Sequence, residues 1–108
     1  MGFESAVAQW QDGVRRLEAV PREDVRLFER VTERIYAELR RRLGSAFTTD
    51  ELVDLYDGGT AWAEQLAMEI APDEPRAWDP RIVVDGAFGR YLREASDYAG
   101  GRRLMPDA

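Results

Sequence analysis

The sequence of 108 residues predicts an all-α protein, folded as a small four-helix bundle around one core. Apolar residues recur every three to four positions in four separate stretches, which is the spacing of one helix face. No stretch sustains the alternation of apolar and polar residues that indicates a half-buried strand. We therefore expect helices over residues 3–19, 21–43, 49–71 and 80–99, a single domain over 1–101 and a flexible C-terminal tail over 102–108.

The first two predicted helices meet at Pro21, and two interpretations of this junction stay open. Either the chain breaks into two helices, or Pro21 kinks one helix that continues to residue 43. The apolar faces stay in phase through Pro21, which favours a kink, whereas a proline inside a helix costs about 3 kcal/mol, which favours a break. A continuous helix would span roughly 60 Å and would need an oligomer to cover its apolar face. Gly44 marks the end of the second stretch in either case.

The third predicted helix begins with a capping box. Thr48 is expected to accept a hydrogen bond from the first turn, while Glu51 reaches back to the backbone at the start of the helix. A glycine pair at 58–59 interrupts this stretch, but Leu52 and Ile70 fall at nearly the same angle around a helix axis on either side of the pair. We therefore predict one continuous helix over 49–71.

The fourth predicted helix begins at Asp79 and Pro80, which are favoured as N-cap and first-turn residues. Trp78 is expected to fold onto Val83 as a hydrophobic staple. Two glycines follow residue 99 and end the helix, which leaves residues 102–108 as the tail.

Four residue types are absent from the chain: Cys, His, Lys and Asn. Without His or Cys there is no His-bearing catalytic triad, no thiolate nucleophile and no zinc site of the usual kind. Without Lys there is no Schiff base, no pyridoxal phosphate anchor and no P-loop lysine. We therefore predict no catalytic residue and no cofactor, and the composition weighs against an enzyme.

The net charge of −6 is unevenly divided along the chain. Residues 1–48 hold nine arginines against eight acids, whereas residues 49–108 hold six arginines against thirteen acids. An acidic chain without a basic, aromatic-bearing patch repels phosphate, so nucleic acid is not an expected partner. No apolar run approaches the roughly 20 residues that span a bilayer, and the N-terminus lacks the layout of a signal peptide. We expect a cytoplasmic protein with no membrane segment.

A candidate partner interface lies on the back of the fourth predicted helix. Its residues share the face opposite the apolar stripe: Ile82, Gly86, Gly89 and Arg93. An exposed glycine inside a helix costs about 1 kcal/mol relative to alanine, so two on one face suggest a shallow groove for another chain. The alternative is that the first helix or the tail of the same chain crosses this face.

Four acidic residues are weak candidates for a metal site on the third predicted helix: Asp50, Asp54, Asp57 and Glu64. Carboxylates three and four positions apart can hold a divalent cation such as Mg²⁺. These carboxylates project away from the core rather than into a cleft, and the EF-hand spacing is absent. A solvated acidic face is the favoured interpretation, so no metal site is predicted.

A stretch near the C-terminus resembles short hypothetical proteins of actinobacteria. The similar segments are Ala77–Pro80, Val84–Tyr91 and Arg93–Arg102, within residues 77–102. The resemblance implies no catalytic, cofactor-binding or metal-binding residue. It agrees with the use of arginine as the only basic residue, which a GC-rich genome favours.

The leading functional hypothesis is a non-enzymatic helical module that binds another protein or a second copy of itself, as in a homodimer. The alternative is a carboxylate- and Mg²⁺-dependent enzyme that acts on a phosphorylated small molecule through the acids of the third helix. A third hypothesis is a DNA-associated regulator that uses an arginine row on the second helix, Arg22, Arg26, Arg30 and Arg34. The acidic net charge weighs against this third hypothesis.

Overall fold

The computed structural model of the chain describes residues 2–19, 22, 25–70, 79–97 and 99–105. Helices dominate this part of the chain, as the sequence predicts, but the expected count of four helices is wrong. The α-helices are α1 (Gly2–Glu18), α2 (Val25–Leu43), α3 (Thr49–Asp57), α4 (Ala61–Ile70) and α5 (Pro80–Glu94). The remaining elements are the strands β1 (Ala46–Phe47), β2 (Ser96–Asp97) and β3 (Arg103–Leu104) and a 3₁₀ turn, η2 (Ala99–Gly101).

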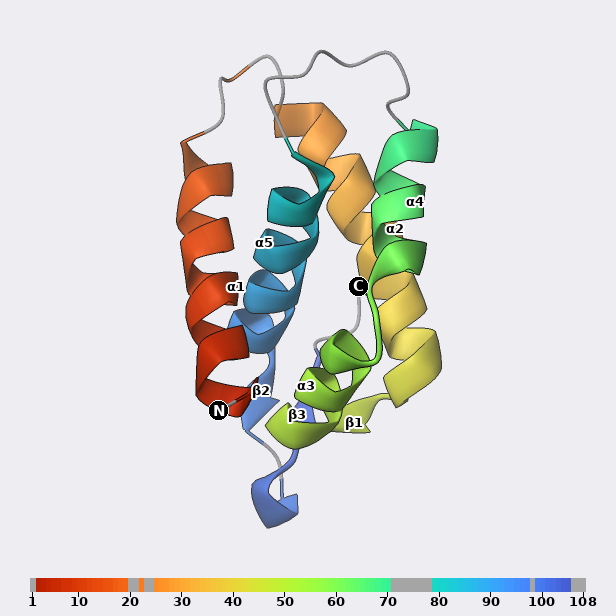
Figure 1. The fold of residues 1–108 in the computed structure, drawn as a ribbon. Helices are drawn as coiled ribbons and strands as arrows, with labels where there is room; N and C mark the ends of the chain where they lie inside the picture. The colour runs from red at the N-terminus through yellow and green to blue at the C-terminus, as the bar shows by residue number, and fades with distance from the viewer. Residues whose placement is uncertain (1, 20–21, 23–24, 71–78, 98, 106–108) are drawn as a thin grey trace.

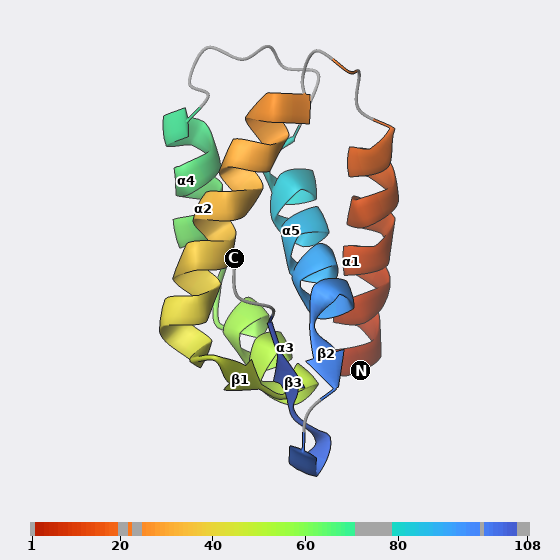
Figure 2. The same cartoon turned by 180° about the vertical axis from the view of Figure 1, so that it is seen from behind.

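Helix α5 lies at the centre of the bundle. It packs against α1 on one side and against α2 and α4 on the other, and its contact with α1 is the most extensive between any two elements. Figures 1 and 2 show the same arrangement from opposite sides, with α3 and the three strands gathered at the end of the bundle where α1 begins. A helix contacted on several sides needs apolar side chains over most of its circumference, and α5 buries Val83, Val84, Ala87, Phe88 and Tyr91.

Helices α1 and α2 are two separate helices that run in opposite directions (Figure 1). The interpretation of one long helix kinked at Pro21 is therefore wrong. The chain reverses, and the apolar faces of both helices pack on the same core, with Trp10 of α1 and Ile35 of α2 fully buried. Residues 20–21 and 23–24, which include Pro21, lie outside the described part of the chain.

The local signals at helix ends are confirmed. The Thr48 hydroxyl accepts a hydrogen bond from the Glu51 N–H at 3.1 Å, and the Glu51 carboxylate accepts one from the Thr48 N–H at 2.9 Å. Asp79 caps α5 by accepting from the N–H of Arg81 at 2.9 Å. Gly44 follows α2 with a φ of 82°. Each of these features depends on residues close in sequence, which explains why the sequence locates them.

The predicted continuous helix over 49–71 is wrong. Helix α3 ends at Asp57, and the N–H of Gly58 bonds back to the carbonyl of Asp54 at 2.9 Å. Gly59 then takes a φ of 115°, which is outside the helical range and interrupts the helix before α4 begins at Ala61. Glycine reaches this conformation without steric cost. The apolar residues stay in phase across the break because both short helices pack on the same core.

The predicted tail is wrong for residues 102–105. Leu104 in β3 pairs with Ala46 in β1 and with Ser96 in β2, so β3 is the middle strand of an antiparallel sheet in the order β1-β3-β2. Met105 is buried, with 6% of its surface exposed. The strand β2 also shortens the expected fourth helix, which ends at Glu94 instead of residue 99. Residues 106–108 lie outside the described part of the chain, as does Trp78 with its expected staple.

Candidate functional site

The contact between α1 and α5 is built on glycines. A Cβ atom added to Gly89 would lie 2.7 Å from the carbonyl oxygen of Trp10, and one added to Gly13 would lie 2.6 Å from the backbone nitrogen of Gly86. A Cβ on Gly86 would collide with Leu17. The two helix backbones therefore touch directly, which no larger residue at Gly13 or Gly89 would allow.

This close contact corrects the predicted partner interface. Gly86 is buried and Gly89 is half-buried, both under α1 of the same chain. Arg93 lies at the edge of the contact and forms an ion pair with Glu18 at 3.4 Å, while Ile82 is half-buried beside α1. The first helix of the same chain therefore packs on Gly86 and Gly89, as the alternative expected, while Gly89 and Arg93 also border a hollow beside that contact. Gly13 was the missed signal, because it supplies the matching small residue on α1.

A groove of about 480 Å³ opens on one flank of this contact, between α1, α5 and β3. We call it the arginine-rimmed groove. Its apolar floor is formed by Val7, Val14, Gly89 and Leu92, with Trp10 buried beneath. Its polar rim is formed by Gln11, Arg15, Glu18, Arg93 and Arg103. An apolar centre within a polar rim is the usual composition of a protein–protein interface.

The rim arginines form weak ion pairs. Among the described residues, Arg15 pairs with Asp12 at 3.6 Å, Arg93 with Glu18 at 3.4 Å and Arg103 with Asp97 at 3.9 Å. These distances are long for ion pairs, and the carboxylates are at least half exposed. Solvent and salt screen such pairs, so the carboxylates of a ligand can take the place of Asp12, Glu18 and Asp97 beside the arginines.

A second hollow, of about 170 Å³, opens on the opposite flank of α1. We call it the polar pocket. Its lining comes from three helices: Gln9, Asp12, Gly13 and Arg16 of α1, Tyr56 of α3, and Arg81, Ile82 and Asp85 of α5. The Tyr56 hydroxyl donates a hydrogen bond to the Asp85 carboxylate at 2.6 Å and lies 3.2 Å from the Gln9 side-chain oxygen. One hydroxyl thereby ties α3 to α5 and α1.

Burial controls the ionisation of this pair. Desolvation raises the pKa of Asp85, and the hydrogen bond from Tyr56 and the positive charge of Arg81 oppose that rise. Burial also raises the pKa of Tyr56, and the neighbouring Asp85 raises it further. The charged carboxylate is therefore held in the pocket at a cost, which the Tyr56 hydrogen bond reduces.

The candidate metal ligands do not gather into a site. Asp50, Asp54 and Asp57 are exposed on α3, while Glu64 lies on α4 beyond the break and accepts a hydrogen bond from the Thr60 hydroxyl at 3.1 Å. Nowhere among the described residues do three side chains of the metal-binding types come together. The break at 58–60 separates residues that a continuous helix would have aligned.

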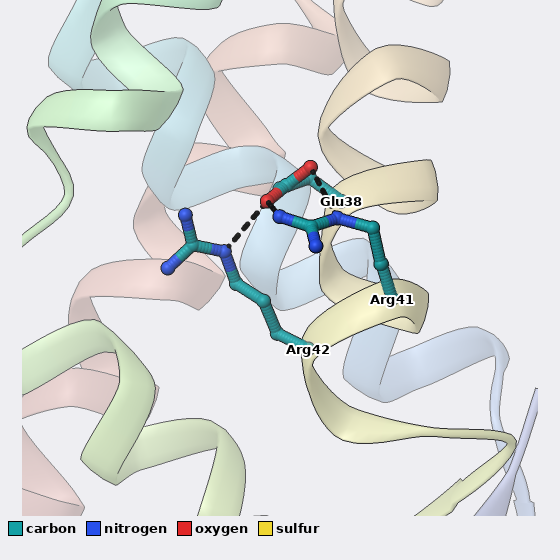
Figure 3. Close-up of polar contacts among 3 residues, drawn as sticks. All are labelled: Glu38, Arg41 and Arg42. Atoms are coloured by element: carbon teal, nitrogen blue, oxygen red, sulfur yellow. Dashed lines mark hydrogen bonds and ion pairs between the residues drawn. The ribbon is translucent and has the colours of Figure 1, made fainter.

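The arginine run at the end of α2 is engaged within the chain (Figure 3). The Glu38 carboxylate accepts hydrogen bonds from Arg41 at 2.6 and 3.2 Å and from Arg42 at 2.8 Å. These hydrogen bonds lower the pKa of Glu38 to about 2. The Arg42 guanidinium also lies 4.5 Å from the ring centre of Trp62, a cation–π contact that joins α2 to α4. The contacts of Arg41 and Arg42 are therefore made within the chain, to Glu38 and Trp62.

Comparison of the chain with protein-family models, curated proteins and solved structures finds no match. Among the described helices, none is both long and apolar enough to cross a membrane. The functional proposals rest on the geometry of the arginine-rimmed groove and the polar pocket.

Proposed function

We propose that this chain is a non-enzymatic protein-binding module, and that the arginine-rimmed groove binds an acidic amphipathic helix of a partner protein. The observation that carries the proposal is the apolar floor framed by Arg15, Arg93 and Arg103 on a chain of net charge −6. The groove lining holds three arginines against one carboxylate, Glu18, and this local excess of positive charge favours a ligand of opposite charge.

The length of the groove suits a helix. Val7, Gln11, Val14 and Glu18 follow one another along a single flank of α1, at the spacing of successive helix turns. Eleven residues of helix rise about 16 Å, which is three turns. A ligand helix of three to four turns can lay its apolar face along such a groove and anchor itself at every turn.

The chemistry of the lining suits binding better than catalysis. Apolar side chains of a ligand would cover the half-buried Val7 and Leu92, while its carboxylates would replace Asp12, Glu18 and Asp97 as partners of the arginines. Hydrogen bonds between guanidinium and carboxylate are strengthened when the ligand excludes water. The alternative of a Mg²⁺-dependent enzyme loses support because Asp50, Asp54 and Asp57 are exposed and Glu64 lies on another helix.

A fluorescence anisotropy titration tests the proposal. The probe is a labelled helical peptide of about 14 residues with leucine on one face and glutamate elsewhere, and its match carries lysine in place of glutamate. We expect saturable binding of the glutamate peptide, and an affinity for the lysine peptide that is lower by roughly tenfold or more. Equal binding of both peptides would contradict the proposal, as would a chain that self-associates and binds neither.

Matched variants separate the groove from net charge. The triple substitution Arg15→Gln, Arg93→Gln and Arg103→Gln is expected to weaken binding of the glutamate peptide roughly tenfold or more. The control triple Arg26→Gln, Arg30→Gln and Arg34→Gln makes the same charge change on exposed residues of α2 and is expected to leave binding nearly unchanged. If both triple variants weakened binding equally, the effect would come from the overall charge, and the proposal that the groove binds the peptide would be rejected.

A further inference from the structure

The polar pocket carries balanced charges in a small space. Arg16 and Arg81 contribute two positive charges to its lining, and Asp12 and Asp85 contribute two negative charges. These charges sum to zero, so the lining as a whole favours neither a lone anion nor a lone cation, whereas a ligand with both signs of charge can pair with both kinds of group. The lining therefore favours a ligand that bears both signs of charge.

Two of these four charged groups already neutralise each other. Arg16 pairs with Asp12 at 3.1 Å, and both side chains are at least half exposed. Arg81 and Asp85 are four residues apart on α5, near enough for Arg81 to lower the pKa of Asp85. Within the part of the chain that the structure describes, however, Arg81 takes part in no ion pair. A guanidinium and a half-buried carboxylate thus face the same hollow without being joined.

The pocket is fixed in place by the surrounding helices. The Tyr56 hydroxyl holds one oxygen of Asp85 at 2.6 Å, so the carboxylate has a set orientation. A Cβ on Gly13 would lie 2.9 Å from the Cβ of Asp85, so the absence of a side chain at Gly13 gives the carboxylate its room. The backbone contact that forms the arginine-rimmed groove on one flank therefore also shapes the pocket on the other.

We propose that the polar pocket binds a small zwitterion, with the ammonium group of the ligand at Asp85 and its carboxylate at Arg81. A volume of about 170 Å³ corresponds to five or six water molecules at about 30 Å³ each, which is enough for a ligand the size of an amino acid. An ammonium donor would bond to the carboxylate that burial disfavours, and a bidentate contact would hold the ligand carboxylate on the guanidinium. This site lies on the opposite flank of α1 from the protein-binding groove and shares Asp12 with the ion pairs of the groove rim.

An NMR titration of the ¹⁵N-labelled chain tests this site. The probes are glycine, β-alanine and γ-aminobutyrate, which place the two charges at increasing separations, with acetate and methylamine as singly charged controls. We expect at least one zwitterion to shift the amide signals of Gln9, Tyr56 and Asp85 saturably, and neither control to do so. The proposal is overturned if no zwitterion saturates these signals, or if acetate or methylamine saturates them equally.

Substitutions assign the binding to the two proposed groups. Asp85→Asn keeps an oxygen that accepts from Tyr56 but removes the charge, so we expect a folded variant whose zwitterion affinity falls roughly tenfold or more. Arg81→Gln is expected to weaken the same binding, whereas Asp54→Asn, an exposed acid on α3, is the matched control and should leave it unchanged. Undiminished binding by Asp85→Asn would reject the proposal.

The triple arginine variant of the groove separates this proposal from the protein-binding one. That variant is expected to bind the zwitterion like the wild-type chain, because Arg15, Arg93 and Arg103 do not line the polar pocket and Asp12, which pairs with Arg15, keeps its shorter ion pair with Arg16 at 3.1 Å. Loss of zwitterion binding in this variant would contradict the assignment to Arg81 and Asp85.

Discussion

The two flanks of α1 differ in chemistry although one helix contact forms both. On one flank, Val7 and Val14 give the groove an apolar floor and Arg15 stands on its rim. On the other flank, Gln9, Asp12 and Arg16 give the pocket a polar lining. The glycine contact with α5 sets the depth of both hollows, while the side chains that α1 projects to each flank set what each can bind. A binding surface is therefore specified by residues beside the packing contact as much as by the contact itself.

The largest expected effect comes from closing the contact that both flanks share. Gly89→Ala and Gly13→Ala each place a Cβ within 3 Å of the α1 or α5 backbone, so we expect each to lower the free energy of unfolding by about 2 kcal/mol. The loss caused by the collision is larger than the gain of about 1 kcal/mol in helix propensity that alanine has over glycine. Chemical denaturation measures the resulting change in the free energy of unfolding. Gly58→Ala is the control, since its φ is −72° and its nearest neighbour would lie 3.3 Å away. If Gly89→Ala proved more stable than wild type, the glycine face would be open.

A smaller effect is expected on the polar flank alone. Tyr56→Phe removes the hydroxyl that donates to Asp85 and leaves a half-buried carboxylate with one partner fewer. We expect a loss of about 1 kcal/mol in unfolding free energy at neutral pH. The loss should shrink in acid, where Asp85 is protonated, while peptide binding in the groove should be retained. A loss that is equal at both pH values would show that the hydroxyl acts without regard to the charge of Asp85.

A third prediction concerns how the contribution of Asp85 to stability changes with pH. Because burial raises the pKa of Asp85 in the folded state, the folded chain binds the proton more tightly than the unfolded chain. The contribution of Asp85 to stability is therefore greatest in acid and falls as the pH rises through its folded pKa. Asp85→Asn lacks this dependence, so the melting temperature of the variant should rise relative to that of wild type as the pH goes from acid to neutral. If the melting temperature of the variant instead fell relative to wild type as the pH rises, the folded state would lower the pKa of Asp85, which contradicts the expected direction.

The smallest effect is expected away from both flanks, at the end of α2. The hydrogen bonds from Arg41 and Arg42 lower the pKa of Glu38 to about 2. Its contribution is present above the unfolded pKa near 4.5 and is lost as the pH falls toward 2. Glu38→Gln should therefore change the melting temperature only slightly at neutral pH, because Arg41 is 72% exposed and solvent screens its ion pair with Glu38, and still less near pH 2. A large change at neutral pH would give this cluster a structural weight that its exposure does not support.

Local chemistry was readable from the sequence, and contacts between distant segments were not. The caps at Thr48 and Asp79 depend on neighbouring residues, and the apolar periodicity of the first two stretches predicted helix faces that pack on one core, where Trp10 and Ile35 are buried. The break near Gly59 escaped prediction because the apolar phase continues through it. The three strands were not predicted because each has two residues, which is too short to show an alternating apolar pattern.

The candidate site shows the same division. The glycines of the fourth helix stood out in the sequence, but nothing local indicated that Gly13 of the same chain would pack on them. The polar pocket gave no signal, because Tyr56 belongs to an apolar stripe and Asp85 lies 29 residues away. Both hollows come from tertiary pairing, which single-sequence periodicity does not encode.

The most direct test of the account maps the glutamate peptide onto the two flanks of α1. In a ¹⁵N–¹H titration, we predict that the peptide shifts the amide signals of the groove flank, including Gln11 and Arg15. The amides of Gln9 and Arg16 on the pocket flank should move far less. Saturable shifts centred on the pocket flank, or an absence of saturable shifts on α1, would contradict the assignment of protein binding to the arginine-rimmed groove.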